Sequence, residues 1–452
     1  MSSTATDRSS NAAKNFTAAL SLQLMTIVLG FVVRGAFARS LGADLVGLHA
    51  VLTDLLTMLS MAELGLSTAM AYSYLRPIRS SDAGRLASLD RYYGRLYRNI
   101  SIGILVLGVT GLPLLKYVVR LDPMPEHLEI YYLILLSNTA LSYSCTHLAS
   151  LVTAHQQAYL IMRHRAWIYF TQVVLQLGTL LVLQSYIAYL LVQVAATLAV
   201  NVVIYTLARH FRTRPHSASN HLSAEDKSFT RDLLWSMGVY KATVLAFSAS
   251  TTILISIIFG TAVVVRYAGY AMLIASVTAL VNSGFSSATS GVGDAVLSET
   301  PERNHELFSG AQTLALLIAP PVTLVFQFAA TQFVVLWLGP QFALGRAATL
   351  ALSVGLYLTM VLQPIWVFRE ATGMYRRTKR LMLAAAILNI VLAVVLSQIL
   401  GLVGIFIAPV VARLVTYFSY EPVLLYRLYL GRRPAGYYRS VALNALLVAA
   451  LG

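Results

Sequence analysis

The stretch IGILVLGVTGLPLL, from Ile102 to Leu115, carries no charged side chain and is apolar on every side. It lacks the alternation of apolar and polar residues that the strands of a transmembrane β-barrel show. A helix needs about 20 mainly apolar residues to cross about 30 Å of hydrocarbon. With its flanks, from 100 to 120, the stretch reaches that length and predicts a membrane-spanning helix.

The whole chain has the composition of a membrane protein. Of its 452 residues, 58% are hydrophobic and only 11% are charged, a balance that excludes an ordinary soluble domain. Apolar runs recur near 15–39, 47–75, 100–120, 128–154, 166–184, 186–208, 233–259, 263–296, 308–335, 344–368, 381–399 and 403–426. The sequence therefore predicts an all-α polytopic membrane protein with about 12 to 14 transmembrane helices.

Basic residues predict the orientation of these spans, because lysine and arginine in short loops stay on the cytoplasmic side. They follow the even-numbered spans, as in the segment from Arg76 to Arg98, whereas the opposite loop from Leu121 to His127 has none. The amino terminus is thus predicted to be cytoplasmic. The formal charge of +15 is spread over several such loops, which favours anionic membrane lipid as the partner and not nucleic acid.

An internal repeat divides the chain. The segment Gly65 to Ala69 on the second span reappears as Gly284 to Ala288 on the eighth. Each copy follows an outer turn with a glycine, and an even number of helices separates the copies, so both enter the membrane from the same side. This predicts two six-helix bundles related by a pseudo-two-fold axis along the membrane normal, with a path between them. The alternative is that these small residues only allow close helix packing.

The repeat and the polar segments predict the domain organisation. A cytoplasmic tail (1–14) precedes an N-terminal six-helix bundle (15–208), a cytoplasmic linker (209–232), a C-terminal six-helix bundle (233–426), and a basic loop with an incomplete further helix (427–452).

Two local features carry further structural expectations. Residues 80–99 place apolar side chains at helical spacing with arginines elsewhere, which predicts an amphipathic helix lying flat at the inner interface. Pro320-Pro321 and Pro364 are expected to interrupt the ninth and tenth spans, as hinges or as plain kinks.

Ionisable groups inside spans are candidates for function, because unpaired charge is costly in the bilayer. Candidates for binding an anionic substrate are Arg34, Arg39, Lys241 and Arg266. Arginine binds phosphate through paired hydrogen bonds, although Arg34 and Arg39 also lie where arginine can reach the lipid headgroups. Candidates for ion coupling or gating are Glu63, Asp54, Asn282 and Asp294. Residues of the type of Asn282, Asp294, Asn389 and Arg413 within spans are more often interhelical hydrogen-bond partners than ligands.

Short fragments spread over nearly the whole chain resemble the Wzx-type oligosaccharide flippases, or polysaccharide transporters, of the multidrug/oligosaccharidyl-lipid/polysaccharide (MOP) exporter superfamily. The fragments are Leu41-Gly42, Val46-Gly47-Leu48, Ala62-Glu63-Leu64-Gly65-Leu66, Ala154, Gln156, Tyr159, Ile253-Leu254-Ile255-Ser256, Gly291-Val292-Gly293-Asp294, Trp337-Leu338-Gly339, Phe368 to Tyr375, Asn389, Gly401 to Ile405 and Glu421-Pro422. One departure is visible, because Thr251 and Thr252 stand where the family commonly has an acidic residue in the seventh span.

The resemblance implies a MATE-like fold and a function. It implies a flippase that carries undecaprenyl-diphosphate-linked oligosaccharide across the bacterial cytoplasmic membrane for polysaccharide biosynthesis, with a proton or sodium ion as a candidate coupling ion. It implies no cofactor. The alternatives are a cation-coupled multidrug exporter or a lipid II flippase of the same superfamily.

A polytopic polysaccharide polymerase and a passive scaffold are the remaining alternatives. An enzyme of the first kind usually carries catalytic groups in a sizeable external loop, and the sequence offers none. It also contains no HExxH, GxSxG or GxxxxGK[ST] motif, so neither a metal site nor a catalytic nucleophile is predicted.

Overall fold

The computed structural model describes residues 5–60, 70, 73–75, 77–78, 80–121, 124–211, 247, 249–286 and 289–452, and all regular elements in these ranges are helical. The first helices are α1 (Ala5–Leu41), α2 (Ala43–Leu59), α4 (Ala83–Thr110), α5 (Leu115–Val118), α6 (Leu128–Ser142), α7 (Thr146–Ala154), α8 (Ala158–Gly178) and α9 (Tyr186–Ala208). After a helix at Ala249–Phe259 come α11 (Thr261–Ser286), α12 (Thr289–Ser298), α13 (Pro301–Leu338), α14 (Arg346–Val361), α15 (Gln363–Ala371), α16 (Tyr375–Leu400), α17 (Leu402–Arg413), α18 (Ser419–Leu425) and α19 (Ala435–Leu451). Short 3-10 or π-helical turns cover Leu112–Leu114, Thr179–Leu183, Pro340–Phe342, Leu414–Phe418 and Tyr426–Leu430.

The described helices are those of a multi-pass membrane protein. Seven of them are long and apolar enough to cross a bilayer, or nine if each bent pair counts as one span. The bent pairs are α4 with the turn and helix that follow it, at 47°, and α14 with α15, at 40°. The second, seventh and eighth predicted spans lie partly outside the described residues, so their full lengths stay predictions.

Polar caps fix several helix starts. The side chains of Asp82, Ser185 and Thr300 each accept a hydrogen bond from the backbone N–H three residues later, at 2.9, 3.3 and 3.4 Å. Such bonds satisfy N–H groups that have no partner within the helix. They explain why α4, α9 and α13 begin where they do.

The expected interfacial helix at 80–99 is wrong. The segment belongs to α4, which continues without a break into the third predicted span, so it cannot lie at an angle to that span. Its apolar side is covered by protein, since Leu86, Leu89, Tyr93 and Tyr97 are buried. The amphipathic pattern therefore marks a helix packed against other helices of the same chain.

Pro320 and Pro321 do not interrupt the ninth span either, because α13 runs through both. A proline has no N–H, so Pro320 leaves the carbonyl of Leu316 without its helical partner. Asn444 Nδ2 in α19 donates to that oxygen at 3.0 Å. The predicted interruption of the tenth span is confirmed at Pro364, which lies just after the 40° bend between α14 and α15.

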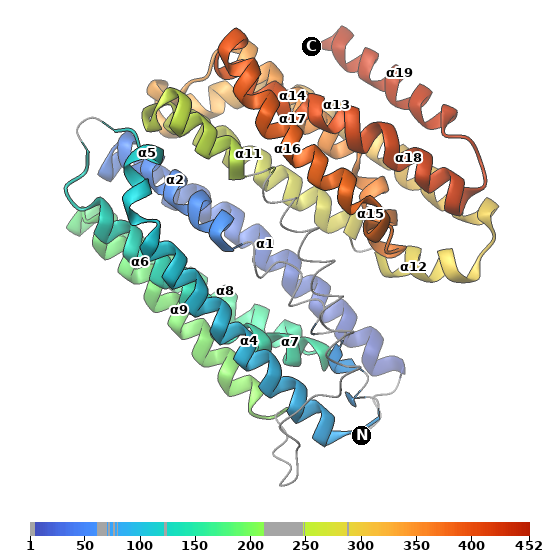
Figure 1. The fold of residues 1–452 in the computed structure, drawn as a ribbon, viewed down its shortest axis with the longest axis horizontal. Coiled ribbons are helices and arrows are strands. Elements are labelled where there is room, and N and C mark those ends of the chain that lie inside the picture. The colour runs from blue at the N-terminus through green and yellow to red at the C-terminus, as the bar shows by residue number, and fades with distance from the viewer. Residues whose placement is uncertain are drawn as a thin grey trace. The chain divides into compact units, whose positions relative to one another are not determined.

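The chain separates into two compact units, Met1–Leu245 and Ala246–Gly452. In the N-terminal unit α4, α6 and α9 run alongside one another, and α8 lies between α9 and α1 (Figure 1). In the C-terminal unit α17 packs between α14 and α16, while α19 lies along α13. The predicted linker at 209–232 lies almost wholly outside the described residues, and the division into bundles at 15–208 and 233–426 stays a prediction.

Turns with positive φ recur at corresponding places in the two units. Counted by predicted spans, they join the first span of each unit to the second, the fourth to the fifth, and the fifth to the sixth. The three pairs are Gly42 (86°) with Gly260 (89°), Gln156 (62°) with Gly373 (66°), and Gln184 (47°) with Gly401 (59°). In each pair the second residue follows the first by about 217 residues. This regular offset is a structural feature that parallels the sequence repeat.

Candidate functional site

Arg34 lies where the first two helices of the N-terminal unit meet. Gly42 turns the chain sharply with a φ of 86°, which L-residues rarely adopt, so α2 starts back beside the last turns of α1. There the Arg34 Nη2 atom donates a hydrogen bond to the carbonyl oxygen of Val46 at 3.3 Å. The tight turn therefore holds a partly buried guanidinium group against the first turn of α2.

Aromatic side chains surround this position. His49 Nδ1 and the Tyr186 hydroxyl of α9 are hydrogen-bonded at 2.9 Å. The Phe37 ring lies 5.7 Å from the His49 ring, and it meets the Tyr186 and Tyr189 rings edge-on at 5.5 and 5.1 Å between centroids. Such edge-to-face pairs add stability beyond the area that they bury. We call Arg34, Phe37, His49, Tyr186 and Tyr189 the Arg34 cluster.

The Arg34 cluster combines one cation with polar aromatic groups. Tyr189, Tyr186 and Asp54 are all close enough to Arg34 to interact with it electrostatically. Among the described residues, Val46 provides the one hydrogen-bond acceptor for Arg34 that the geometry shows. A guanidinium group has five N–H donors, so most of them stay available for an anion such as a phosphate.

The other predicted site residues are distributed as follows. Asp54 on α2 is partly buried near Arg34, a proximity that the sequence did not predict. Arg39 is exposed in the last turn of α1, so Arg34 and Arg39 do not share one environment. In the C-terminal unit Arg266 and Asn282 are exposed on α11.

Two of the predicted site residues lie outside the described part of the chain, and a third is described by its backbone alone. Glu63 and Lys241 lie outside the described residues. Asp294 belongs to α12, and its side chain is outside the description.

Sequence reasoning missed the aromatic part of the Arg34 cluster. His49 and Tyr186 are 137 residues apart, and neither carries a charge pattern that marks it. Tyr186 and Tyr189 share one face of α9 at a spacing of three residues, but tyrosines at this spacing in a span usually indicate packing. One residue could have indicated this part of the cluster from the sequence: His49, a polar side chain in the first half of the second predicted span.

Asn389 and Arg413 are confirmed as interhelical hydrogen-bond partners. Arg413 Nη1 donates to Thr359 Oγ1 at 2.7 Å and joins α17 to α14. Asn389 Nδ2 donates to Ser250 Oγ at 3.3 Å and joins α16 to the Ala249–Phe259 helix.

Solved structures with the same fold include transporters of the MOP superfamily and a lipid flippase. An inward-facing MATE-family multidrug transporter of the MOP superfamily matches with a TM-score of 0.65 at 13% identity, over 96% of this chain and 98% of that one. The lipid II flippase MurJ in an inward closed conformation matches with a TM-score of 0.65 at 11% identity, over 95% and 96%. A MOP transporter from Pyrococcus furiosus, described as having a binding pocket of reversed polarity, matches with a TM-score of 0.57 at 16% identity, over 97% and 96%.

A scan against protein-family models gives no match, and a search of curated proteins gives none either. At these identities the structural likeness establishes the fold and not the substrate. The chain is an all-α, multi-pass membrane protein with the fold shared by MATE transporters and MurJ.

Proposed function

We propose that this protein is a flippase that carries undecaprenyl-diphosphate-linked oligosaccharide from the inner to the outer leaflet of the bacterial cytoplasmic membrane. The amino terminus lies in the cytoplasm, and no covalent bond of the substrate changes. The observation that carries the proposal is the position of Arg34, a guanidinium group that the turn at Gly42 holds against α2 and that lies within the candidate membrane span Thr17–Leu41.

A lipid-linked diphosphate poses a specific physical problem. Its lipid tail is stable in the bilayer, whereas its charged head costs several kcal/mol wherever water or a counter-charge is missing (roughly 3 kcal/mol or more for a single charge). An arginine can offset that cost through charge-assisted, paired hydrogen bonds to phosphate oxygens. The donors that Arg34 does not use on Val46 fit this role.

The structural likeness to MurJ supports a lipid-linked substrate, while the likeness to MATE transporters supports the alternative of a multidrug exporter. The aromatic rings of the Arg34 cluster would suit a cationic drug, because ring faces attract cations. The positive charge of Arg34 among those rings opposes such a ligand. We therefore favour an anionic substrate.

Asp54 adds a candidate for ion coupling. Its carboxylate is an electrostatic neighbour of Arg34, so binding of a proton or sodium ion at Asp54 would change how strongly Arg34 holds an anion. Glu63, Asn282 and Asp294 stay candidates for the same role, and Lys241, Arg266 and Arg39 stay candidates for substrate binding.

Deletion in the host organism, followed by analysis of lipid-linked intermediates, tests the function. Complete oligosaccharide units accumulating on the cytoplasmic face are the expected result. Unfinished units would indicate an enzyme instead, and an unchanged pool with greater drug sensitivity would indicate a multidrug exporter.

Substitutions of Arg34 test the site within the same strain. Arg34→Ala is expected to reduce export at least tenfold, and Arg34→Lys to retain part of it, because lysine keeps the charge without the paired donors. Arg303→Ala is the matched control, since Arg303 forms an exposed ion pair with Glu306. Normal export in both Arg34 variants would remove this residue from the site.

A further inference from the structure

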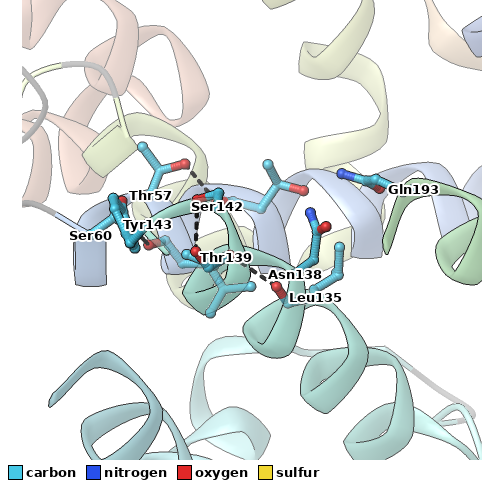
Figure 2. A pocket seen from close by; sticks show the side chains of 10 residues that line it. Thr57, Ser60, Leu135, Asn138, Thr139, Ser142, Tyr143 and Gln193 are labelled. Atoms are coloured by element: carbon cyan, nitrogen blue, oxygen red, sulfur yellow. Dashed lines mark hydrogen bonds between the residues drawn. The ribbon is translucent and has the colours of Figure 1, made fainter. Parts of the chain in front are cut away.

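A recess with a polar lining opens between α2, α6 and α9, entirely within the N-terminal unit (Figure 2). Its volume is about 290 Å³, and none of the ten side chains that line it carries a formal charge. Figure 2 shows the hydroxyls of Thr57, Thr139 and Ser142 on one side of it and the amides of Asn138 and Gln193 on the other. Several spans thus contribute neutral polar groups to one space.

The hydroxyl groups are arranged as hydrogen-bond acceptors. Thr57 Oγ1, Thr139 Oγ1 and Ser142 Oγ donate to backbone carbonyls of their own helices at 2.8, 2.9 and 2.7 Å. Since a hydroxyl has one donor and two acceptor lone pairs, each oxygen can still accept a hydrogen bond from a ligand.

The amide of Asn138 supplies the complementary donor. Its Oδ1 accepts a hydrogen bond from Thr197 Oγ1 at 2.7 Å, which fixes the orientation of the amide and leaves Nδ2 as the group free to donate into the recess. Gln193 adds a second amide from α9. The recess therefore offers donors and acceptors together, without charge.

This lining selects the chemical class of a ligand. Neither a phosphate nor an ammonium group finds a counter-charge among the lining residues, whereas a sugar ring presents hydroxyls that donate and accept at once. Ligand pockets commonly measure about 300 to 1,000 Å³, so a recess of about 290 Å³, just below that range, suits one ring and not a chain of rings. Serine and threonine between membrane helices often serve only close packing, but here they border an open space.

The recess lies next to the Arg34 cluster along the same helix faces. On α2, Thr53 and Thr57 follow His49 at intervals of four residues, which places them about 6 and 12 Å further along the helix. On α9, Gln193 follows Tyr189 by four residues in the same way. An anionic group at Arg34 would thus have the neutral recess beside it within the same unit.

We propose that the recess between α2, α6 and α9 binds one uncharged sugar residue of the lipid-linked substrate and gives the protein its preference for glycosylated over bare lipid diphosphate. The inference rests on the proposed function, because it takes the diphosphate to lie at Arg34. It assigns sugar recognition to residues that are separate from the guanidinium group.

Binding to the full-length protein in detergent tests the assignment with two probes, undecaprenyl diphosphate and the same lipid carrying the host oligosaccharide. The wild type is expected to bind the glycosylated lipid more tightly. Asn138→Leu and Thr139→Val keep the approximate shape of the side chain. Each should weaken binding of the glycosylated lipid by up to about tenfold and leave binding of the bare lipid unchanged. Arg34→Ala should weaken both.

Asn201→Leu is the matched control, because Asn201 is an amide on α9 that does not line the recess. Equal weakening by this control and by both recess variants would overturn the assignment, as would unchanged preference in the recess variants. If the wild type binds neither lipid, the proposed function fails and the recess assignment fails with it. If it binds both lipids equally, the recess assignment alone fails.

Discussion

Arg369 and Glu421 form a buried ion pair that ties α15 to α18. The Arg369 Nη1 atom lies 2.9 and 3.1 Å from the two carboxylate oxygens of Glu421, with 4% and 0% of the two side chains exposed. The ring of Trp366 lies 5.8 Å from the guanidinium carbon. Both charges are thus removed from solvent, so each depends on the other.

We expect single substitutions of this pair to destabilise the protein strongly. Arg369→Ala removes the guanidinium group that bonds the buried Glu421 carboxylate, and Glu421→Leu removes the carboxylate from the buried Arg369. Breaking a buried ion pair in this way typically costs about 3–5 kcal/mol. The double variant Arg369→Met with Glu421→Leu removes both charges and should recover most of that loss. Unfolding midpoints of the purified protein in detergent measure both effects.

The exposed pair Arg303–Glu306, with 58% and 65% of the side chains exposed, supplies the control. Its disruption should cost about 0–1 kcal/mol, because solvent screens an exposed pair. Midpoints for the two buried single variants that match this control would contradict a mutual dependence of Arg369 and Glu421.

Gly404 allows the close approach of α16 and α17. A Cβ atom at this position would overlap the carbonyl group of Leu396 and lie 2.8 Å from the Ser397 nitrogen. These are backbone atoms, which cannot rotate away as a side chain can. We expect Gly404→Ala to lower stability by about 1–3 kcal/mol, the usual cost of overpacking.

Gly103→Ala in α4 is the matched control for Gly404→Ala. There an added Cβ meets no atom within 4 Å among the described residues. Alanine also favours a helix over glycine by about 0.8–1 kcal/mol. The unfolding midpoint should therefore stay the same or rise, and a drop as large as that of Gly404→Ala would show that crowding is not the cause.

Sequence reasoning predicted the all-α fold because hydrophobicity and length mark spans directly. It failed at 80–99, where the buried side chains of Leu86, Leu89 and Tyr93 produce the same apolar stripe as a helix lying on lipid. It failed at Pro320 because the hydrogen bond that compensates for the proline comes from Asn444, more than a hundred residues away.

In the candidate site, too, the features set by nearby sequence were predicted, and those set by contacts between distant residues were not. Arg34 was predicted from its own charge within an apolar run. The surrounding rings of His49 and Tyr186 were not, because pairing over 137 residues depends on how helices pack. A single sequence provides no direct signal for that packing.

Substitutions at the corresponding turn residues Gln184 and Gly401 should change the stability of the protein by different amounts. Gln184 has φ 47° and ψ 36°, a left-handed conformation that costs an ordinary residue about 1–2 kcal/mol. Gly401 has φ 59° and ψ −139°, which is essentially restricted to glycine. We expect Gly401→Ala to lower the free energy of unfolding by about 1–3 kcal/mol.

Gln184→Gly should change stability little, because relief of the left-handed conformation offsets the greater entropy of unfolded glycine. A Cβ at Gly401 meets no described atom within 4 Å, so its cost would come from the backbone alone. Unfolding midpoints of both variants check the difference. Equal effects would mean that the two turns are not held in the conformations described.

Asn444 joins α19 to two other helices of the C-terminal unit. Its Nδ2 donates to the carbonyl of Leu316 at 3.0 Å, and its Oδ1 accepts from the Tyr357 hydroxyl at 2.9 Å. Asn444→Leu removes both bonds and leaves the Leu316 oxygen unpaired, because Pro320 has no N–H to offer it. We expect this variant to lower the free energy of unfolding by about 1–3 kcal/mol and to speed backbone amide hydrogen exchange in α19.

A second variant isolates the contribution of the proline. Pro320→Ala restores an N–H that can bond Leu316 within α13, so Asn444→Leu should cost less in that background than in the wild type. The control is Leu443→Ala, a neighbouring side chain on α19 that is 57% exposed. A double-mutant cycle of unfolding midpoints gives the coupling between Asn444 and Pro320. If the cost of Asn444→Leu is the same in both backgrounds, the amide does not compensate for the proline, and α13 must continue through Pro320 for another reason.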